Sequence, residues 1–354
     1  MNHSDTEPTP DLDPRLRRYS RQVLFTPFGE RGQAGLRTAH VTVVGCGALG
    51  TVIANTLVRA GVGALRIIDR DFIELDNLQR QVLFDEQDIS DNLPKAEAAA
   101  RKLRRVNSAV EVEGVVDDVN PSNVSSLLED TDLILDGNDN FETRFLVNDF
   151  AVKHDLPWIY GACIGSEGLV LPIIPHETPC LRCIWEDAPP AGMSPTCDTA
   201  GVLAPIVNIV ASLQALEAMK ILGGHLDQVK RELQTIDVWA GTYRGMSMQA
   251  AYEQGDCPCC KHATFDFLSG EHTSTTTTLC GRNAVQVLPP IGSRVDFRQI
   301  AERIHAAGVK RNEFMLRFRA ADFDVTLFPD GRAIIKGTSD PAAARSFYAK
   351  YIGA

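Results

Sequence analysis

The chain has 354 residues, of which 46 are acidic and 35 basic, so its formal net charge is −11. This length suggests two domains, one large and one small. The acidic balance argues against a general binder of nucleic acid or of anionic membranes, because such binding requires a basic surface. Residues 1–12 are polar and acidic, unlike a signal peptide, so we expect them to be disordered and the protein to be cytoplasmic.

Strands and helices alternate through the first half of the chain. Asp13-Pro14 is a helix start, and an amphipathic helix is predicted over 15–25. Strands are predicted at 41–44, 64–69, 110–115, 133–136 and 158–161, and helices at 51–60, 95–106, 123–128 and 144–154. This alternation predicts an α/β fold with a doubly wound, mostly parallel, Rossmann-like sheet. The domain that contains the sheet is expected to span 13–265.

The pattern changes after residue 165. Short strands are predicted at 168–174 and 234–238, and the apolar run 201–222 carries four polar side chains, which favours a buried helix over a membrane span. A Ser/Thr tract lies in a predicted linker, 266–278. The remainder, 279–354, is predicted to be a small α+β module. Its expected elements are strands at 314–318, 324–328 and 333–336, helices at 296–307 and 340–351, and a hairpin turn at Asp330-Gly331.

A glycine-rich loop follows the first predicted strand and opens a helix. Gly45, Gly47 and Gly50 match the G-x-G-x-x-G pattern, which lets the backbone approach a phosphate at the positive end of a helix. Asp69 ends the next strand, where an acidic residue binds ribose hydroxyls. Taken alone, this pattern indicates an adenine nucleotide and favours NAD or FAD.

Positive side chains expected near the same sheet edge change that interpretation. The segment 76–81 brings Arg80 and two amides, Lys95 opens a helix, and Arg21 adds a cation near the N-terminus. A dinucleotide needs few such charges, whereas a triphosphate split at its α-phosphorus needs cations on the leaving pyrophosphate. The alternative for each residue is a solvated charged face.

A second polar loop, 136–140, follows a buried strand at the edge where α/β sheets bind ligands. Its Asp139 is a candidate ligand of Mg²⁺, a cation that takes carboxylate and phosphate oxygens. The alternative is an Asx-rich turn that caps the helix containing Arg144.

The nine cysteines include two C-x-x-C pairs. Four thiolates, from Cys180, Cys183, Cys257 and Cys260, suit a closed, tetrahedral, structural zinc site. A redox motif is the alternative, and Cys259 leaves the register of the second pair open.

Three other cysteines have separate interpretations. Cys197 lies just before the apolar run, where a helix N-terminus would stabilise a thiolate, so it is a candidate nucleophile for an activated acyl group. The alternative is an unreactive loop cysteine. Cys46 and Cys163 are expected to be small buried hydrophobic side chains.

These motifs, in this order and spacing, resemble the MoeB/ThiF family, the bacterial relatives of ubiquitin-activating enzymes. The resemblance covers about 13–262. The matching elements are RYSRQ (18–22), GCGALG (45–50), DRD (69–71), LDNLQRQ (75–81), Lys95, DGNDN (136–140) with Arg144, CLRC (180–183), TCDTAGVLAP (196–205), SLQALEAMKIL (212–222) and CPCC (257–260). Two residues depart from the family pattern: Ala48 stands at a common glycine and Asp76 at a common serine.

The resemblance implies a homodimeric adenylyltransferase that uses ATP and Mg²⁺. Such enzymes adenylate the C-terminal glycine of a ubiquitin-fold sulfur carrier, ThiS- or MoaD-like and ending in Gly-Gly, for thiamine or molybdenum-cofactor synthesis, and release pyrophosphate. A cysteine desulfurase or sulfurtransferase would be a further partner.

The resemblance also assigns roles to residues. It implies that Asp69 binds ribose, that Arg80 and Lys95 bind phosphates, that Arg21 reaches the partner subunit's ATP, and that Asp139 organises Mg²⁺. Cys197 matches a loop cysteine that takes part in thioester or acyl-persulfide chemistry in some members. The expected ATP-binding residues are Gly45, Gly47, Ala48, Gly50, Asp69, Asp71, Asp76, Asn77, Leu78, Gln79, Arg80, Gln81, Lys95, Asp139 and Asn140.

Other functions remain open on the sequence. One is a zinc-stabilised scaffold that binds a ubiquitin-like partner without turning over ATP, and another is an NAD-dependent oxidoreductase. The C-terminal module has Cys280 at its start but no obvious loop of backbone amides around it, so it is not an obvious rhodanese domain. Carrier docking or dimer support is a hypothesis for this module.

Overall fold

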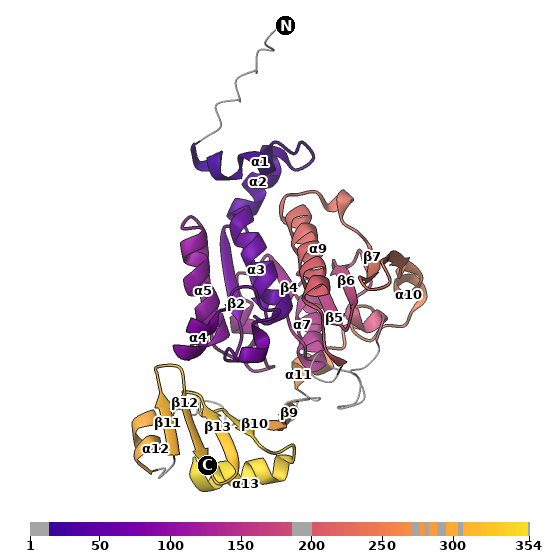
Figure 1. Ribbon diagram of the computed structural model, residues 1–354. Coiled ribbons are helices and arrows are strands. Elements are labelled where there is room, and N and C mark those ends of the chain that lie inside the picture. Colours follow the sequence, from indigo (N-terminus) through magenta and orange to yellow (C-terminus); the bar gives the residue numbers. More distant parts are fainter. Residues whose placement is uncertain are drawn as a thin grey trace.

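The computed structural model describes residues 14–185, 200–270, 276–279, 283–288, 295–303 and 307–352, which form two sheets with helices packed on them (Figure 1). The N-terminal segment expected to be disordered lies outside the described residues, as do Cys197 and Cys280. The role predicted for Cys197 therefore stays a prediction.

The first sheet has eight strands in the order β3-β2-β1-β4-β5-β6-β7-β8. Its parallel half consists of β1 (His40–Val44), β2 (Ala64–Ile68), β3 (Glu111–Val115), β4 (Leu133–Asp136) and β5 (Trp158–Ile164). Antiparallel strands β6 (Glu167–Ile173), β7 (Glu232–Asp237) and β8 (Thr242–Ser247) extend it. The expected doubly wound, mostly parallel Rossmann-like sheet is confirmed.

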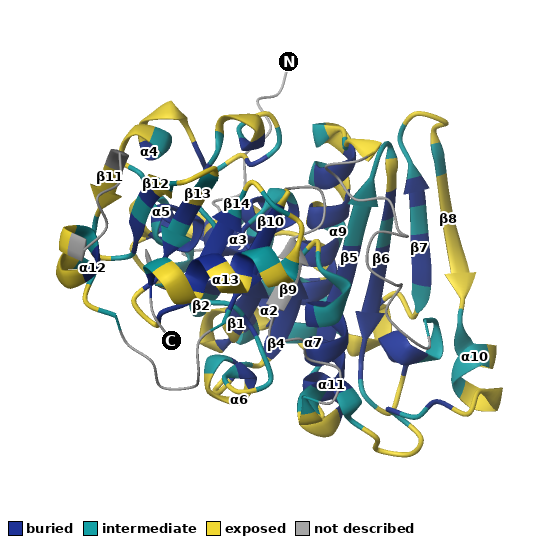
Figure 2. Ribbon diagram, turned by 90° about the horizontal axis from the view of Figure 1, so that it is seen from below, coloured by how far each residue is buried: buried dark blue, intermediate teal, exposed yellow. Residues whose placement is uncertain are grey.

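Helices cover both faces of this sheet, because successive strand side chains point to opposite sides. Val43 of β1 belongs to one core and its neighbour Val44 to the other. The first core is closed by α3 (Ala48–Ala60), α5 (Lys95–Val106) and α9 (Ala204–Leu222), and the second by α6 (Val124–Leu127), α7 (Phe141–Lys153) and α11 (Asp266–Ser269). Figure 2 shows the buried strands between these layers and the exposed edge strand β8.

Helix α9 confirms the predicted buried helix. It is the one helix in the described part of the chain that is long and apolar enough to cross a membrane, but it packs on α3, β5 and β6. Its buried Gln214 donates through Nε2 to the carbonyls of Asp136 (2.9 Å) and Ile159 (3.2 Å). Gln214 therefore fastens the helix to β4 and β5.

Shorter elements surround the first sheet. The predicted helix 15–25 is instead a 3₁₀ turn, η1 (Pro14–Tyr19), followed by one turn of α-helix. The remaining short elements are α1 (Ser20–Val23), α2 (Gly29–Thr38), η2 (Leu75–Asn77), α4 (Glu86–Ser90), η3 (Leu181–Cys183), η4 (Leu226–Gln228) and α10 (Gln249–Gln254).

The second sheet is antiparallel, with the order β11-β12-β13-β14-β10-β9. Its strands are β9 (Thr276–Leu279), β10 (Ala284–Val287), β11 (Ala307–Arg311), β12 (Leu316–Ala320), β13 (Phe323–Leu327) and β14 (Ala333–Lys336), with helices α12 (Phe297–Arg303) and α13 (Pro341–Tyr351). We call residues 276–352 the C-terminal module. The predicted hairpin turn is confirmed, because Gly331 has a φ of +85° between β13 and β14.

The predicted linker 266–278 is wrong at both ends. Residues Asp266–Ser269 form α11, and its Phe267 stacks on Phe145 of α7 with ring centroids 4.9 Å apart. The threonines of 276–278 pair with β10 as part of β9. A Ser/Thr tract resembles a linker by composition, but threonine also fits a strand when a partner strand is available.

Candidate functional site

The segment that leads from β1 into α3 contains two glycines, Gly45 and Gly50, that larger residues cannot replace without a backbone clash. Gly45 has a φ of +94°, a Cβ on it would lie 2.6 Å from the Gly137 backbone, and its N–H donates to Ile68 (2.8 Å). A Cβ on Gly50 would lie 2.0 Å from the Gly45 carbonyl oxygen. The first turn of α3 therefore begins tightly against the strand ends, and its N–H groups lie at the carboxyl edge of the sheet, a position that suits an anion.

Gly47 caps α3 in a different environment. The nearest atom to a Cβ on Gly47 would be the Gly137 carbonyl oxygen, 3.8 Å away. We expect Gly50→Ala to lower the free energy of unfolding by about 2 kcal/mol or more through backbone clash. Gly47→Ala, the matched control, should leave unfolding within about 0.5 kcal/mol of wild type, yet weaken ATP binding because its methyl enters the space that a phosphate would approach. Chemical denaturation measures the free energy of unfolding, and calorimetric titration measures ATP binding. If the two variants changed both quantities equally, the different roles assigned to Gly47 and Gly50 would be wrong.

Asp69, Asp71 and Lys95 form a charged group beside this loop. Asp69 accepts hydrogen bonds from the backbone N–H of Cys46 and of Asp71, both at 2.6 Å. Lys95 is 3% exposed, and its Nζ lies 3.4 Å from Asp71 Oδ2. Burial raises the pKa of Asp69, and Lys95 counteracts part of this shift. The structure thus places three predicted ATP-binding residues together at the carboxyl ends of β1 and β2.

Arg70 and Asp118 belong to the same edge; the sequence analysis named Arg70 only within the DRD motif, without a role, and did not name Asp118. Arg70 Nη1 lies 2.7 Å from Asp118 Oδ2, and its Nε lies 3.9 Å from Asp71 Oδ1. Burial opposes the charge of Arg70, but Asp118, Asp71 and Asp139 outweigh it and raise the pKa. The available signal was position: Arg70 follows β2 and Asp118 follows β3, so both fall at the edge where ligands bind.

The segment 76–81 folds back on itself after η2. Asn77 and Gln81 are buried, and the Asn77 side chain accepts from the N–H of Glu74 at 3.2 Å. Arg80 is half-buried and donates through Nη1 to the Asp76 carbonyl at 2.7 Å. The side chains of Asp76 and Gln79 are exposed, and Leu78 packs partly on the core. Arg80 is thus held in one position by its hydrogen bond to the Asp76 carbonyl, and a bound phosphate would take the place of that carbonyl.

The loop after β4 is held by an internal ion pair. Arg144 Nε lies 2.8 Å from Asp136 Oδ2, and Arg144 Nη2 donates to the carbonyls of Asn138 (2.6 Å) and Gly161 (2.9 Å). Burial raises the pKa of Asp136, and Arg144 acts against that shift. Arg144 thus shapes the backbone of the loop.

Two residues of this loop have different roles in the structure. Asn140 caps α7 by accepting from the N–H of Glu142 at 2.9 Å, as the Asx-turn alternative expected. Asp139 is exposed at the carboxyl edge, and the pKa of nearby Arg70 responds to its charge. This position suits a carboxylate that binds a cation together with phosphate oxygens.

Helix α1, which contains Arg21, lies at the end of the molecule farthest from the C-terminal module (Figure 1). Its neighbour Tyr19 accepts from Asn107 Nδ2 (2.9 Å) after α5, and Gln22 donates to the Ala60 carbonyl (3.0 Å) at the end of α3. Both helix ends lie away from the glycine loop, because α3 and α5 begin at the carboxyl edge of the sheet. The structure therefore does not bring Arg21 to the nucleotide residues of its own chain.

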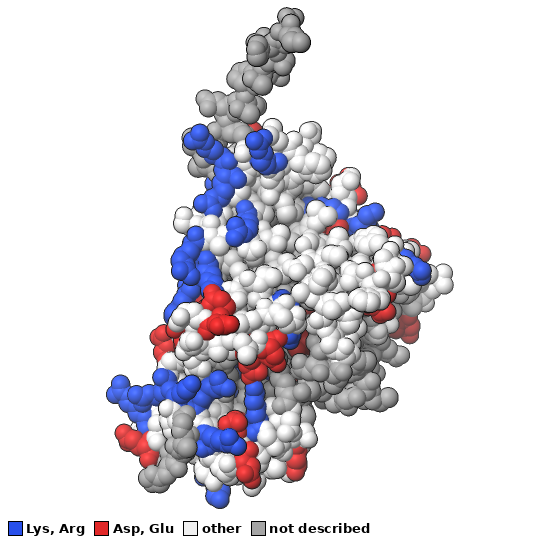
Figure 3. Space-filling view, viewed as in Figure 1, with Lys and Arg blue, Asp and Glu red and all other residues white. Residues whose placement is uncertain are grey.

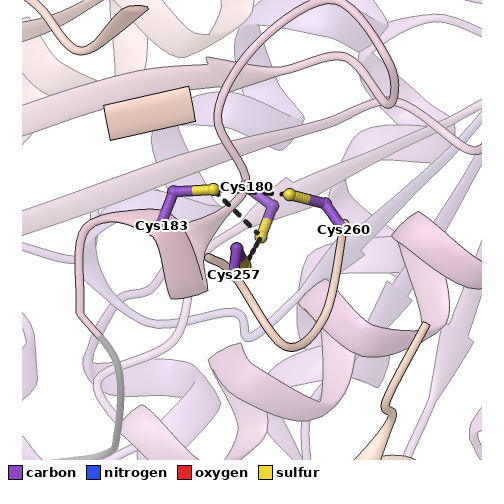
Figure 4. A group of neighbouring side chains, drawn as sticks. All are labelled: Cys180, Cys183, Cys257 and Cys260. Atoms are coloured by element: carbon purple, nitrogen blue, oxygen red, sulfur yellow. Dashed lines mark hydrogen bonds between the residues drawn. The ribbon is translucent and has the colours of Figure 1, made fainter. Parts of the chain in front are cut away.

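Four cysteines meet between η3 and the loop before α11 (Figure 4). The Sγ atoms of Cys180, Cys183, Cys257 and Cys260 all lie within 4.8 Å of one another. The Cys180–Cys257 and Cys183–Cys260 distances are 3.6 and 3.4 Å. Four sulfurs bound tetrahedrally at about 2.3 Å would be about 3.8 Å apart, so the group fits a zinc ion.

The other three described cysteines, Cys46, Cys163 and Cys259, lie outside the four-sulfur group. Cys259 is buried, and its Sγ accepts from Asn148 Nδ2 at 3.4 Å, so Cys257 and Cys260 form the second pair of the four-sulfur group. Cys46 is fully buried, as expected. Cys163 is partly exposed, which corrects the expectation of a buried side chain, because β5 continues past its pairing with β4.

Comparisons with known proteins agree on one family. The model of the ThiF family matches residues 19–259. The sulfur carrier protein ThiS adenylyltransferase of Bacillus subtilis is 45% identical over 338 residues, which cover 95% of this chain and 99% of that protein. The sulfur carrier protein adenylyltransferase of Thermus thermophilus is 36% identical over 69% of this chain and 90% of its own length. Among solved structures, Escherichia coli MccB with ATP matches with a TM-score of 0.56 and 25% identity, covering 66% of this chain and 71% of that chain.

Proposed function

The chain belongs to the ThiF family and is an adenylyltransferase, and on this basis we propose that it transfers AMP from ATP to the C-terminal glycine of a ubiquitin-fold sulfur-carrier protein. The observation that carries the proposal is the convergence of the glycine loop, Asp69 and Lys95 at one sheet edge. The name of the Bacillus subtilis relative supports a ThiS-like carrier, and hence thiamine synthesis, over a MoaD-like one.

The proposed reaction needs positioning and charge neutralisation rather than a covalent enzyme intermediate. A carrier carboxylate oxygen attacks the α-phosphorus, the bond to the bridging oxygen breaks, and pyrophosphate leaves with the electron pair. Asp69 would bind the ribose hydroxyls. Lys95 and Arg80 would exchange their present partners for phosphate oxygens. Asp139 would hold Mg²⁺, which neutralises phosphate charge when bound.

We further propose that the four-cysteine group holds a structural zinc ion and that the enzyme is a homodimer. The sulfur spacing supports the first proposal, and the four reduced thiolates that it requires fit the expected cytoplasmic location. The second is supported by Leu24 and Phe25, which are 49% and 64% exposed directly after α1. A partner packed on this apolar surface would place Arg21 at a subunit boundary.

ATP–pyrophosphate exchange tests the proposed function. Zinc-loaded full-length protein is assayed with labelled pyrophosphate and no carrier, a ThiS-like carrier or a MoaD-like carrier. We expect exchange that depends on the ThiS-like carrier and disappears when its last glycine is deleted. Exchange with the MoaD-like carrier alone would overturn the choice of pathway. No exchange with either carrier would favour the scaffold alternative.

A further inference from the structure

The C-terminal module uses only one face of its sheet for its own helices. Val285 and Val287 of β10 and Ile335 of β14 share a core with α12 and α13. The alternate residues of the same strands point to the other side. That inner face carries Ala284, Gln286, Ile334 and Lys336, and it lies against the carboxyl edge of the first sheet (Figures 1 and 2).

Apolar side chains join the inner face to the segments that follow β2 and β3. Phe328, Ala284 and Ile334 pack against Phe72 and Val116, and the rings of Phe72 and Phe328 lie 6.1 Å apart. Phe72 comes directly after Asp71, and Val116 comes directly after β3. The module thus covers the two chain segments that carry the acidic groups of the nucleotide site.

Charged groups cross the same boundary. Lys336 forms an ion pair with Glu74, and the buried guanidinium of Arg332 lies 3.8 Å from Asp117 Oδ1. Figure 3 shows Lys and Arg along the upper margin of the module and Asp and Glu gathered above it. The boundary between the two parts therefore contains opposite charges as well as apolar contacts.

One polar path runs from the module into the site. Gln286, which is fully buried, donates through Nε2 to Asp118 Oδ2 at 2.8 Å. The same oxygen lies 2.7 Å from Arg70 Nη1, and Arg70 Nε is 3.9 Å from Asp71. Asp71 in turn pairs with Lys95. Each member of the path is thus held by the member before it.

We propose that the C-terminal module forms a wall of the nucleotide site and that Gln286 is a positioning residue for ATP binding. Gln286 fixes Asp118, whose carboxylate holds the guanidinium of Arg70 at 2.7 Å, so that Arg70 reaches Asp71 only at 3.9 Å. Without this restraint, Arg70 would move closer to Asp71 and Asp69 and compete with the ribose hydroxyls for the Asp69 carboxylate. The inference rests on the proposed function, and it adds a contribution from outside the segment that matches the family model.

The test compares two full-length variants with wild type. Gln286→Leu removes the hydrogen-bond donor to Asp118 and keeps a side chain of similar size. We expect it to raise the Kd and the KM for ATP about tenfold, the loss typical of one hydrogen bond to a charged group. Its kcat and its KM for the carrier should stay within twofold of wild type, because the lost contact acts only on nucleotide binding. Lys336→Ala, the matched control, removes a half-exposed ion pair across the same boundary and should leave the Kd for ATP within twofold.

The outcomes separate this inference from the proposed function. If wild type does not bind ATP by calorimetry, the proposed function fails. If wild type binds ATP and Gln286→Leu binds it equally well, only the positioning role fails. If Gln286→Leu does not fold, Asp118→Asn provides the second test: it keeps an acceptor for Gln286 but loses the charge that draws Arg70, so the Kd for ATP should again rise about tenfold. An unchanged Kd in that variant would overturn the proposal.

Discussion

Replacing Arg80 with alanine is expected to lower the rate of ATP–pyrophosphate exchange by about 10²- to 10³-fold, the loss typical of one group that stabilises transition-state charge. Among the described residues, Arg80 donates through Nη1 to the Asp76 carbonyl within its own segment, at 2.7 Å. This local contact holds no other element in place, so its loss should leave the fold intact. Exchange kinetics with saturating carrier measure the effect, and circular dichroism measures the fold.

Arg101→Ala provides the matched control. Arg101 is an exposed arginine that pairs with Glu97 at 2.5 Å within α5, the helix that Lys95 opens. A surface pair of this kind contributes little, so exchange should remain within twofold. If the two variants lose activity equally, general surface charge rather than the position of Arg80 governs the rate, and the assigned role is wrong.

Loss of the four-cysteine group should produce the second large effect, on stability. Structural zinc contributes on the order of 10 kcal/mol to the folding of zinc-finger peptides. In a larger domain with its own core we expect Cys180→Ser to cost about 3–5 kcal/mol and to lower Tm by about 10 °C. Metal analysis should find one zinc per chain in wild type and none in the variant, and a strong chelator should lower the Tm of wild type similarly.

A cysteine outside the group separates metal loss from thiol loss. Cys163 lies on β5, outside the four-cysteine group, and is partly exposed; its Sγ lies 3.8 Å from the Ile206 carbonyl oxygen. Cys163→Ser should keep the zinc and leave Tm within about 2 °C of wild type. A metal-free wild-type protein with an unchanged Tm would show that the thiols pack without an ion.

The sequence predicted best those elements whose local and tertiary preferences agree. Helix α5 begins and ends at the predicted residues, because Pro94 precedes it and alanines line its buried face. Strand β4 is fully buried, so a continuous apolar run identified it. Helix α2 was missed because its three glycines hide a helix that packing stabilises. Strand β8 was missed because it is exposed and lacks alternation.

In the candidate site, too, the residues set by local sequence were predictable and those set by long-range contacts were not. The glycine loop and Asp69 were predictable, since both follow strands at fixed offsets in one unit of the fold. Gln286 was not, because it lies 168 positions from Asp118 along the chain, and only folding of the second sheet brings them together. A single sequence contains no signal for such a contact.

The strand order of the C-terminal module has a consequence for protein synthesis. Strand β10 pairs with β14, not with β11, so the inner face cannot form until the last strand has left the ribosome. Domains fold as units during synthesis, N-terminal first, so the first sheet would fold ahead of this face. A nascent chain that stops before Ala333 would carry the glycine loop but no completed wall beside it. A chain truncated at this point would therefore fold its first sheet but bind ATP weakly.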